Sequence, residues 1–388
     1  MLRAQRKLYW EGGKALAPMV RACKLPLRLL CLAYGADVVY TEELIDKKLV
    51  ETERIQHGDG PNGLVEYVWK KDRSTVMSTC ALERERVVLQ IGSASPDLVV
   101  RAAQLYERDI AGVDINMGCP KHFSISGGMG AALLRNPETA EDMLRALRRT
   151  LDPNVTVTCK IRLLEDDAKT VELVRRLEAA GAQAIGVHMR ETHHRPREPA
   201  IWDRLRAVVD AVQVPVLANG DVYTAKDIDT LRGDHGAKSI MIARGALGNP
   251  SVFRPEGPLP IFDVMRDYTR VARLVGQGDR STIWMLNQMI RYDTTLPRKP
   301  KDAVCTAIKG PKPDLNVIAD AMGLESSKLL PIKDDITWEK LGLKPPAALS
   351  ASSVSATLLE GTDGPPAKRV KLGDNSGESA QTTHNQST

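Results

Sequence analysis

The chain has 388 residues and carries 54 lysines and arginines against 49 aspartates and glutamates, for a formal charge of +5. This length suits one α/β barrel of about 250 residues with additions, and so small a charge excess permits an anionic partner without requiring one. The six cysteines form no CxxC pair and follow no secretory leader, which argues against a disulfide framework or a zinc cluster and indicates a reducing compartment. No apolar run approaches the roughly 18 residues of a membrane span, so we expect no membrane partner, and the scattered cysteines give no reason to expect a metal.

Short β-branched segments alternate with segments of helical periodicity, which is typical of βαβ units around a parallel sheet. A doubly wound fold would carry a GxGxxG turn after its first strand, but that strand ends in Pro18-Met19-Val20-Arg21. The pattern therefore predicts an α/β fold of the (β/α)8 TIM-barrel class. The eight expected strands are residues 15–20, 38–42, 87–91, 112–116, 155–161, 184–188, 215–218 and 239–243.

The connecting segments carry helix start and stop signals. Ser95-Pro96 and Asn136-Pro137 each place a capping residue before a proline at the first helical position. A helix at 167–180 is expected to stop at Gly181, which favours a left-handed C-terminal cap.

Polar residues follow nearly every expected strand, at the end where barrels build their sites. Taken singly, Lys160 and His188 are most simply explained as solvated or hydrogen-bonded rim residues, and Gln90 as a cap. Their joint placement favours a functional site. In chain order the strand-end residues are Pro18, Met19, Glu42, Glu43, Gln90, Asn116, Cys119, Lys160, Arg162, His188, Arg190, Asn219, Gly220, Ala243, Arg244 and Gly245.

The last two strands end in Asn219-Gly220-Asp221 and Ala243-Arg244-Gly245, where barrels commonly hold a phosphate. A phosphorylated sugar would fit these glycines. However, Lys160 could balance charge on a reduced ring, and Gln90 could hydrogen-bond the ring's carbonyl and amide edge, which favours a flavin. The residues therefore point to an FMN-binding barrel enzyme.

Cys119 lies in Asn116-Met117-Gly118-Cys119-Pro120-Lys121, just beyond the fourth expected strand. A free cysteine usually behaves as a small buried hydrophobe. Gly118 and Pro120 instead set a turn around the thiol, and the polar, glycine-rich loop 122–130 follows. Local sequence alone leaves a structural and a reactive thiol equally open.

Several motifs in a fixed order resemble the tRNA-dihydrouridine synthase family. Residues 40–46 and 118–121 are most similar to its eukaryotic branch that modifies uridine 20 of the D-loop. The resemblance is dense over about residues 14–250 and looser to about 324. The motifs are Ala17-Pro-Met-Val-Arg21, Asp114-Ile-Asn-Met-Gly-Cys-Pro-Lys121, Gly127-Gly-Met-Gly-Ala-Ala-Leu133, Thr158-Cys-Lys-Ile-Arg162, Val187-His188 and Ala218-Asn-Gly-Asp221.

This resemblance implies that NADPH or NADH reduces bound FMN, that a hydride then passes to carbon 6 of a flipped-out uracil, and that Cys119 protonates carbon 5. The thiol suits this role because its free pKa near 8.5 leaves it protonated at neutral pH. The implied tRNA contacts are Glu43, Lys121, Arg162, Arg190 and Arg291. The implied FMN contacts are Pro18, Met19, Val20, Gln90, Asn116, Lys160, His188, Asn219, Gly220, Asp221, Ala243, Arg244 and Gly245.

The domain organisation follows from the composition and the resemblance. We expect an N-terminal extension at 1–13, the flavin barrel at 14–255, a helical tRNA-binding domain at 256–325, and a linker with a low-complexity tail at 326–388. Helix 281–291 should pack Met285, Met289 and Ile290 inward and leave Arg291 near a loop that meets RNA. One departure concerns Met189, which stands where many related sequences have glycine and brings the local site geometry into question.

The tail contains Lys368-Arg369-Val370-Lys371, which resembles a signal read by a nuclear import receptor. Its presence predicts a protein of the cytoplasm and the nucleus. Two other functions remain open on sequence grounds. A flavin barrel acting on a small molecule would not need the basic helical segment, and a non-catalytic tRNA-binding protein would not need Cys119, Lys160 and His188 in register.

Overall fold

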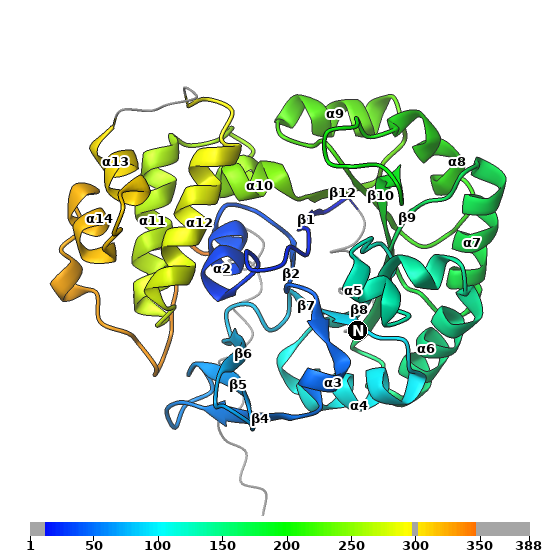
Figure 1. Ribbon diagram of the computed structural model, residues 1–388, viewed down its shortest axis with the longest axis horizontal. Helices are drawn as coiled ribbons and strands as arrows, with labels where there is room; N and C mark the ends of the chain where they lie inside the picture. The colour runs from blue at the N-terminus through cyan, green and yellow to red at the C-terminus, as the bar shows by residue number, and fades with distance from the viewer. Residues whose placement is uncertain (1–11, 297–301, 347–388) are drawn as a thin grey trace, which may run out of the picture. The chain divides into compact units, whose positions relative to one another are not determined.

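Eight parallel strands close into a barrel in the computed structural model, which describes residues 12–296 and 302–346 (Figure 1). The strand order is β2-β1-β12-β11-β10-β9-β8-β7, and pairing of β2 with β7 closes the ring. The predicted TIM barrel is confirmed. The import-signal residues Lys368, Arg369 and Lys371 lie outside the described residues, as does most of the N-terminal extension.

All eight predicted strands are present, with ends that differ by up to four residues. The first predicted strand ran too far, since residues 18–20 belong to the loop that follows it, whereas the sixth continues past its predicted end. The barrel strands are β1 (Lys14–Leu16), β2 (Val38–Tyr40), β7 (Val87–Gly92), β8 (Gly112–Asn116), β9 (Thr156–Leu163), β10 (Ile185–Glu191), β11 (Val216–Asn219) and β12 (Ser239–Ile242).

The longer helices between the strands pack their apolar sides on the outside of the barrel. Ser95 caps its helix by accepting a hydrogen bond from the Leu98 N–H at 3.3 Å, and Gly181 has a φ of +106°, as a left-handed cap requires. Asn136 occupies the N-cap position before Pro137, as predicted, but its side chain makes no capping bond to a backbone N–H and its amide donates to the Thr139 hydroxyl at 2.9 Å. The helices are α2 (Leu25–Ala33), α3 (Asp46–Leu49), α4 (Pro96–Tyr106), α5 (His122–Ser126), α6 (Pro137–Thr150), α7 (Asp167–Ala179), α8 (Leu205–Val209), α9 (Ala225–Gly233) and α10 (Arg244–Gly248).

A small antiparallel sheet, which the sequence analysis did not predict, lies between β2 and β7 in the chain. It consists of β4 (Thr52–Gln56), β5 (Val65–Trp69) and β6 (Thr75–Thr79). Tyr67 anchors it by stacking on Tyr106 of α4, with ring centroids 3.8 Å apart, and by donating to Asp109 at 2.6 Å. Just before this sheet, β3 (Leu44–Ile45) pairs with the carboxyl end of β7. Because Tyr40 also pairs with Val88 of β7, the short segment 41–43 is held at both of its ends.

The barrel interior is filled below the site by a separate cluster of buried apolar side chains. Tyr40 is its bulkiest member, and Tyr40 and Met241 are both fully buried. Small residues such as Ala15 and Ala184 leave room for them. A packed interior means that the barrel is no pore, so polar groups at the strand ends rest on a solid apolar floor.

The chain continues after the barrel into α11 (Ile261–Leu274), α12 (Asp279–Tyr292), α13 (Ala303–Lys309) and α14 (Leu315–Ala321). Tyr34, which follows α2, donates to Asp267 of α11 at 2.9 Å, and this bond ties the later helices to the barrel. In α12, Met285, Met289 and Ile290 are buried and Arg291 is exposed, as expected. Among the described residues, every helix is too short or too polar to cross a lipid bilayer.

Candidate active site

Four neighbouring strands direct alternate side chains into the carboxyl end of the barrel. Because side chains along a strand alternate between its two faces, Lys160 and Arg162 of β9 share the inner face while Cys159 and Ile161 are buried on the outer one. The same alternation applies to the other three strands. It brings together Gln90 of β7, Asp114 and Asn116 of β8, Thr158, Lys160 and Arg162 of β9, and His188 and Arg190 of β10.

Asp114 is the centre of a buried hydrogen-bond network at the bottom of this site. It is fully buried and accepts from the Gln90 amide at 2.8 Å and from the Thr158 hydroxyl at 2.6 Å. Gln90 in turn accepts from the Asn116 amide at 3.3 Å. Burial raises the pKa of Asp114 to about 6, against the hydrogen bonds and the nearby Lys160 ammonium. Gln90, which was predicted to contact FMN, therefore also links Asp114 to Asn116.

The Cys119 loop is fixed on both sides by side chains from the barrel. The side-chain oxygen of Asn116 accepts from the N–H groups of Gly118 and Cys119 at 2.9 and 3.0 Å. The Arg162 guanidinium donates to the Gly118 carbonyl at 2.8 Å and to the Glu191 carbonyl at 3.0 Å. These bonds hold Cys119 at the rim of the barrel, where it is the one cysteine of the six that is not buried.

The Cys119 thiol lies among groups that act on its proton. Burial raises its pKa and the Glu43 carboxylate raises it further, whereas the Lys121 N–H and the Ser124 hydroxyl act in the opposite direction. The net effect keeps the pKa of Cys119 above its ordinary value. The group is thus a protonated thiol at neutral pH, suited to donate a proton rather than to attack as a nucleophile.

Lys160 and His188 lie on neighbouring strands, where Lys160 pairs in register with Gly186 and His188 with Arg162. Burial, followed by the Arg162 charge, lowers the pKa of Lys160 to about 8. Burial and the cations Lys160, Arg162 and Arg190 hold the pKa of His188 far below its usual range, so the ring is neutral. A Cβ on Gly186 would lie 3.2 Å from Cγ of Lys160, so glycine at this position leaves room for the lysine stem.

A cavity of about 180 Å³ opens beside His188, and its walls contain many of the predicted cofactor residues. Asp221 accepts two bonds from Arg190 at 2.6 Å and also pairs with Arg244. Three guanidinium groups thus face the cavity with one carboxylate to balance them. The lining residues are Arg162, His188, Arg190, Pro196, Asn219, Gly220, Asp221, Val222, Tyr223, Ala243 and Arg244.

Several predicted residues support this cavity through the protein's own contacts. Arg190 is buried, donates to the Glu198 carbonyl at 2.7 Å and lies 3.1 Å from the His188 ring. Asn219 donates to the Met241 carbonyl at 2.8 Å. At Gly245 a Cβ would lie 2.4 Å from the Val222 carbonyl oxygen, so the chain can pass there only without a side chain.

The remaining predicted residues lie outside this cavity. Pro18, Met19 and Val20 form the loop after β1, where Val20 is 46% exposed. Lys121 is exposed beside Cys119, and Arg291 is exposed near the end of α12. Met189 is directed away from the site into the layer between strands and helices, where it is fully buried. It therefore leaves the space beside His188 free.

The sequence analysis missed two groups that touch the predicted residues. Ser124, on the short helix after Cys119, is buried beside the thiol. Tyr223 lines the cavity, with the Arg244 guanidinium 5.6 Å from its ring centroid. Tyr223 follows Asn219-Gly-Asp closely enough that the motif could have suggested it, whereas the buried face of a five-residue helix gives no such signal.

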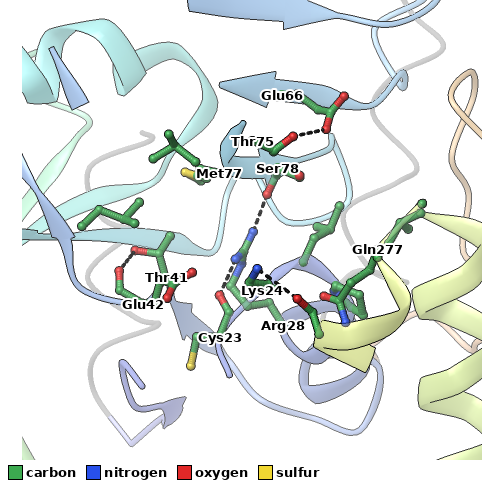
Figure 2. A pocket seen from close by; sticks show the side chains of 18 residues that line it. Cys23, Lys24, Arg28, Thr41, Glu42, Glu66, Thr75, Met77, Ser78 and Gln277 are labelled. Carbon is green, nitrogen blue, oxygen red and sulfur yellow. Dashed lines mark hydrogen bonds between the residues drawn. The ribbon is translucent and has the colours of Figure 1, made fainter. Parts of the chain in front are cut away.

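A second cavity, of about 150 Å³, is lined by a different set of residues (Figure 2). It lies among the start of α2, the small sheet and the turn before α12. Arg28 donates there to the Cys23 and Ser78 carbonyls at 2.6 and 2.7 Å and pairs with buried Glu83. Its polar groups are therefore largely engaged with each other, and Cys119, Lys160 and His188 do not contribute to it.

Comparison with known proteins agrees with the predicted fold and family. The family model "Dihydrouridine synthase (Dus)" matches residues 15–258. The tRNA-dihydrouridine(20) synthase [NAD(P)+] of Schizosaccharomyces pombe is 39% identical over 291 residues, covering 73% of this chain and 60% of that protein. The Saccharomyces cerevisiae protein of the same name is 39% identical over 300 residues, covering 72% of this chain and 78% of its own length.

The chain thus spans less than two thirds of the S. pombe relative. Among solved structures, a 2-naphthoyl-CoA reductase complex is similar at a TM-score of 0.43 and 11% identity, over 63% of this chain and 50% of that one. The family model covers well over half of the present chain and includes every barrel strand except the first residue of β1. The chain belongs to the dihydrouridine synthase family.

Proposed function

We propose that this protein reduces a uridine in the D-loop of tRNA, at position 20, to 5,6-dihydrouridine with NAD(P)H as reductant. Its relatives named for that reaction and its membership of the family support the proposal. The observation that carries it is the placement of one accessible thiol, held protonated, at the rim of a barrel that also presents Lys160, His188 and an arginine-lined cavity.

The residues present fit FMN as the cofactor. An anionic phosphate suits a cavity where Arg162, Arg190 and Arg244 outnumber the single carboxylate of Asp221. The Lys160 ammonium has no hydrogen-bond acceptor among the described residues, so it is available to a carbonyl or an anionic ring. Bound FMN would supply the hydride that reaches carbon 6 of the uracil. Lys160 and His188 would hold its ring, and Gly220 and Arg244 its phosphate.

The protein's own residues supply the proton and the orientation. Cys119 donates the proton that carbon 5 of the uracil receives, and its raised pKa ensures that the proton is present at neutral pH. Asn116 and Arg162 hold the loop that carries the thiol, so the proton is presented from a fixed position. This fixed placement reduces the entropy cost of reaching the reactive geometry.

We assign tRNA as the partner because a folded RNA must present the uridine flipped out of its stack while its phosphates meet cations. Lys121 is exposed next to Cys119, within reach of a nucleotide at the rim. Arg280, Arg291, Lys309 and Lys312 of the helical segment are not in any ion pair within the described ranges. Their charges are free to meet the RNA backbone.

Reduction of unmodified tRNA tests the proposed function. Purified protein supplied with FMN and NADPH is incubated with an unmodified transcript, and dihydrouridine is mapped by mass spectrometry. We expect product at position 20 with the wild type and none with Cys119→Ala. FMN-loaded protein that oxidises NADPH but leaves every uridine intact would instead favour a reductase of small molecules.

We also propose that the protein enters the nucleus as well as the cytoplasm. The proposal rests on the cluster Lys368, Arg369 and Lys371 in the sequence, which has the composition that import receptors bind. Fluorescence imaging of a tagged full-length chain tests it. Replacing the three residues with alanine should remove the nuclear signal, and an unchanged distribution would contradict the proposal.

A further inference from the structure

We propose that Glu43 is a positioning residue, whose carboxylate beside the Cys119 thiol favours the protonated form of that thiol and its reprotonation after each turnover. The inference rests on the proposed function, because it assigns Cys119 the role of proton donor. It gives Glu43 a role within the enzyme in place of the tRNA contact expected from sequence.

The backbone places the Glu43 carboxylate beside the thiol. Glu43 precedes β3, whose Leu44 and Ile45 pair with Ile91 and Gly92 at the carboxyl end of β7. A Cβ on Gly92 would lie 2.8 Å from Oε1 of Glu43. Glycine at this position therefore admits the carboxylate into the space next to the Cys119 loop.

The carboxylate has few other partners there. Its Oε1 atom is buried and has no hydrogen-bond partner among the described residues. Burial raises the pKa of Glu43, while a hydrogen bond with Cys119 and the charge of Lys121 oppose that rise. A buried carboxylate with an unpaired oxygen gains from a donor close to it, and the S–H of Cys119 is such a donor.

The same contact acts on the thiol in return. A thiolate beside a carboxylate would place two negative charges together, so Glu43 favours the protonated state of Cys119. The other charged groups near the thiol are Lys160 and Arg162 from β9, which interact with it, and Lys121 from its own loop, whose ammonium acts on Glu43. The two cations of β9 favour the thiolate. Glu43 is the one described acid that the thiol meets to offset them.

Glu43 neither gives up nor takes up a proton in the chemical step. The S–H bond of Cys119 breaks and a C–H bond forms at carbon 5 of the uracil, while the hydride at carbon 6 originates from NAD(P)H through the flavin. The resulting thiolate takes a proton from water before the next turnover. Repulsion from Glu43 makes that uptake favourable at neutral pH, which is how the residue serves the reaction without touching the substrate.

The test compares Glu43→Gln with Glu42→Gln in the full-length protein. Glutamine keeps the size of the side chain and removes its charge. Glu42 is a matched control, since its carboxylate accepts from the Arg21 N–H at 2.8 Å and lines the second cavity (Figure 2). Glu43→Asp, which keeps the charge but shortens the reach, serves if the glutamine variant folds poorly.

The first readout is the pH dependence of Cys119 alkylation by iodoacetamide, followed residue by residue by mass spectrometry. It needs no tRNA, and the five buried cysteines serve as internal references. Because the thiolate is the form that reacts, we expect Glu43→Gln to move the alkylation midpoint toward lower pH by at least about one unit. Glu42→Gln should leave it in place, and Glu43→Asp should give a smaller shift.

The second readout is the pH profile of tRNA-dependent reoxidation of the NADPH-reduced enzyme. The alkaline fall of this rate should move to lower pH in Glu43→Gln by the same amount as the alkylation midpoint. An unchanged alkylation midpoint would overturn the proposal, and so would a shifted midpoint with an unchanged rate profile. Wild-type protein that forms no dihydrouridine would refute the proposed function, while the alkylation comparison would still judge the Glu43–Cys119 contact.

Discussion

Replacement of Asp114 by asparagine should stabilise the protein at neutral and alkaline pH. Asp114 is fully buried, and its pKa is raised from 3.8 to about 6. A group whose folded-state pKa is raised contributes stability below its unfolded pKa and loses that contribution as pH rises through the folded value. The wild type therefore loses stability between about pH 4 and pH 7 that an uncharged side chain would retain.

The magnitude follows from the size of the shift. A change of about two pKa units corresponds to about 3 kcal/mol. The substituted asparagine can still accept from the Gln90 amide, and its own amide can donate to the Thr158 hydroxyl, so both neighbours stay satisfied. We expect the free energy of unfolding of Asp114→Asn to exceed that of wild type by about 1.5 kcal/mol at pH 5 and about 3 kcal/mol at pH 8.

Urea unfolding of both proteins across this pH range measures the difference. Titration of groups that do not interact with Asp114 is shared by the two proteins and cancels in the comparison. The reasoning would be refuted by a wild type as stable as the variant at pH 8. That result would mean that the Lys160 ammonium compensates the buried charge in full. The stabilised variant should also lose activity, because Lys160 loses the anion that acts on it.

Three further changes test the site. Asp221→Asn leaves buried Arg190 without its anion and should lower the free energy of unfolding by about 2 kcal/mol at pH 7. Arg190 and the Ala200 N–H hold the pKa of Asp221 below 3.8 despite its burial, so the difference between the two proteins should vanish only below about pH 4. Equal denaturation curves at pH 7 would contradict this prediction. Gly220→Ala places a side chain at a φ of +133° with its Cβ 3.0 Å from that of Ala200, so it should cost about 1–3 kcal/mol in urea unfolding and weaken FMN binding in a fluorescence titration; unaltered binding would show that FMN does not use this turn. Lys160→Met keeps the apolar stem and removes the charge, so anaerobic stopped-flow should record FMN reduction by NADPH slowed about tenfold or more, and an unchanged rate would exclude a role for the cation.

The sequence predicted the barrel because the alternation of strand and helix signals is repeated eight times, which is the number of strands in this fold. Residues directed inward on β8, β9 and β10 could be identified because strand periodicity fixes which face a side chain takes. Met189 illustrates the same rule, since its position between His188 and Arg190 already placed it on the opposite face. The strand ends were less accurate, because apolar residues such as Met19 and Val20 continue past β1 into the loop.

Contacts between distant segments could not be predicted in this way. The pairing of β3 with β7, which brings Glu43 to Cys119, depends on a two-residue strand with no periodic signal. Asp221 was predicted to contact the cofactor, but its bridge between Arg190 and Arg244 depends on how three loops meet. The small sheet was missed for a similar reason: its short strands of five residues gain their stability by packing on α4.

Reoxidation of the NADPH-reduced enzyme by unmodified tRNA, followed without oxygen, tests most directly whether Cys119 protonates a tRNA uridine. We expect wild type to be reoxidised in step with the appearance of dihydrouridine at position 20. Cys119→Ala should be reduced by NADPH at the wild-type rate but reoxidised by tRNA at least about 100-fold more slowly. Equal reoxidation of the two proteins, or no reoxidation of wild type by tRNA, would contradict the account.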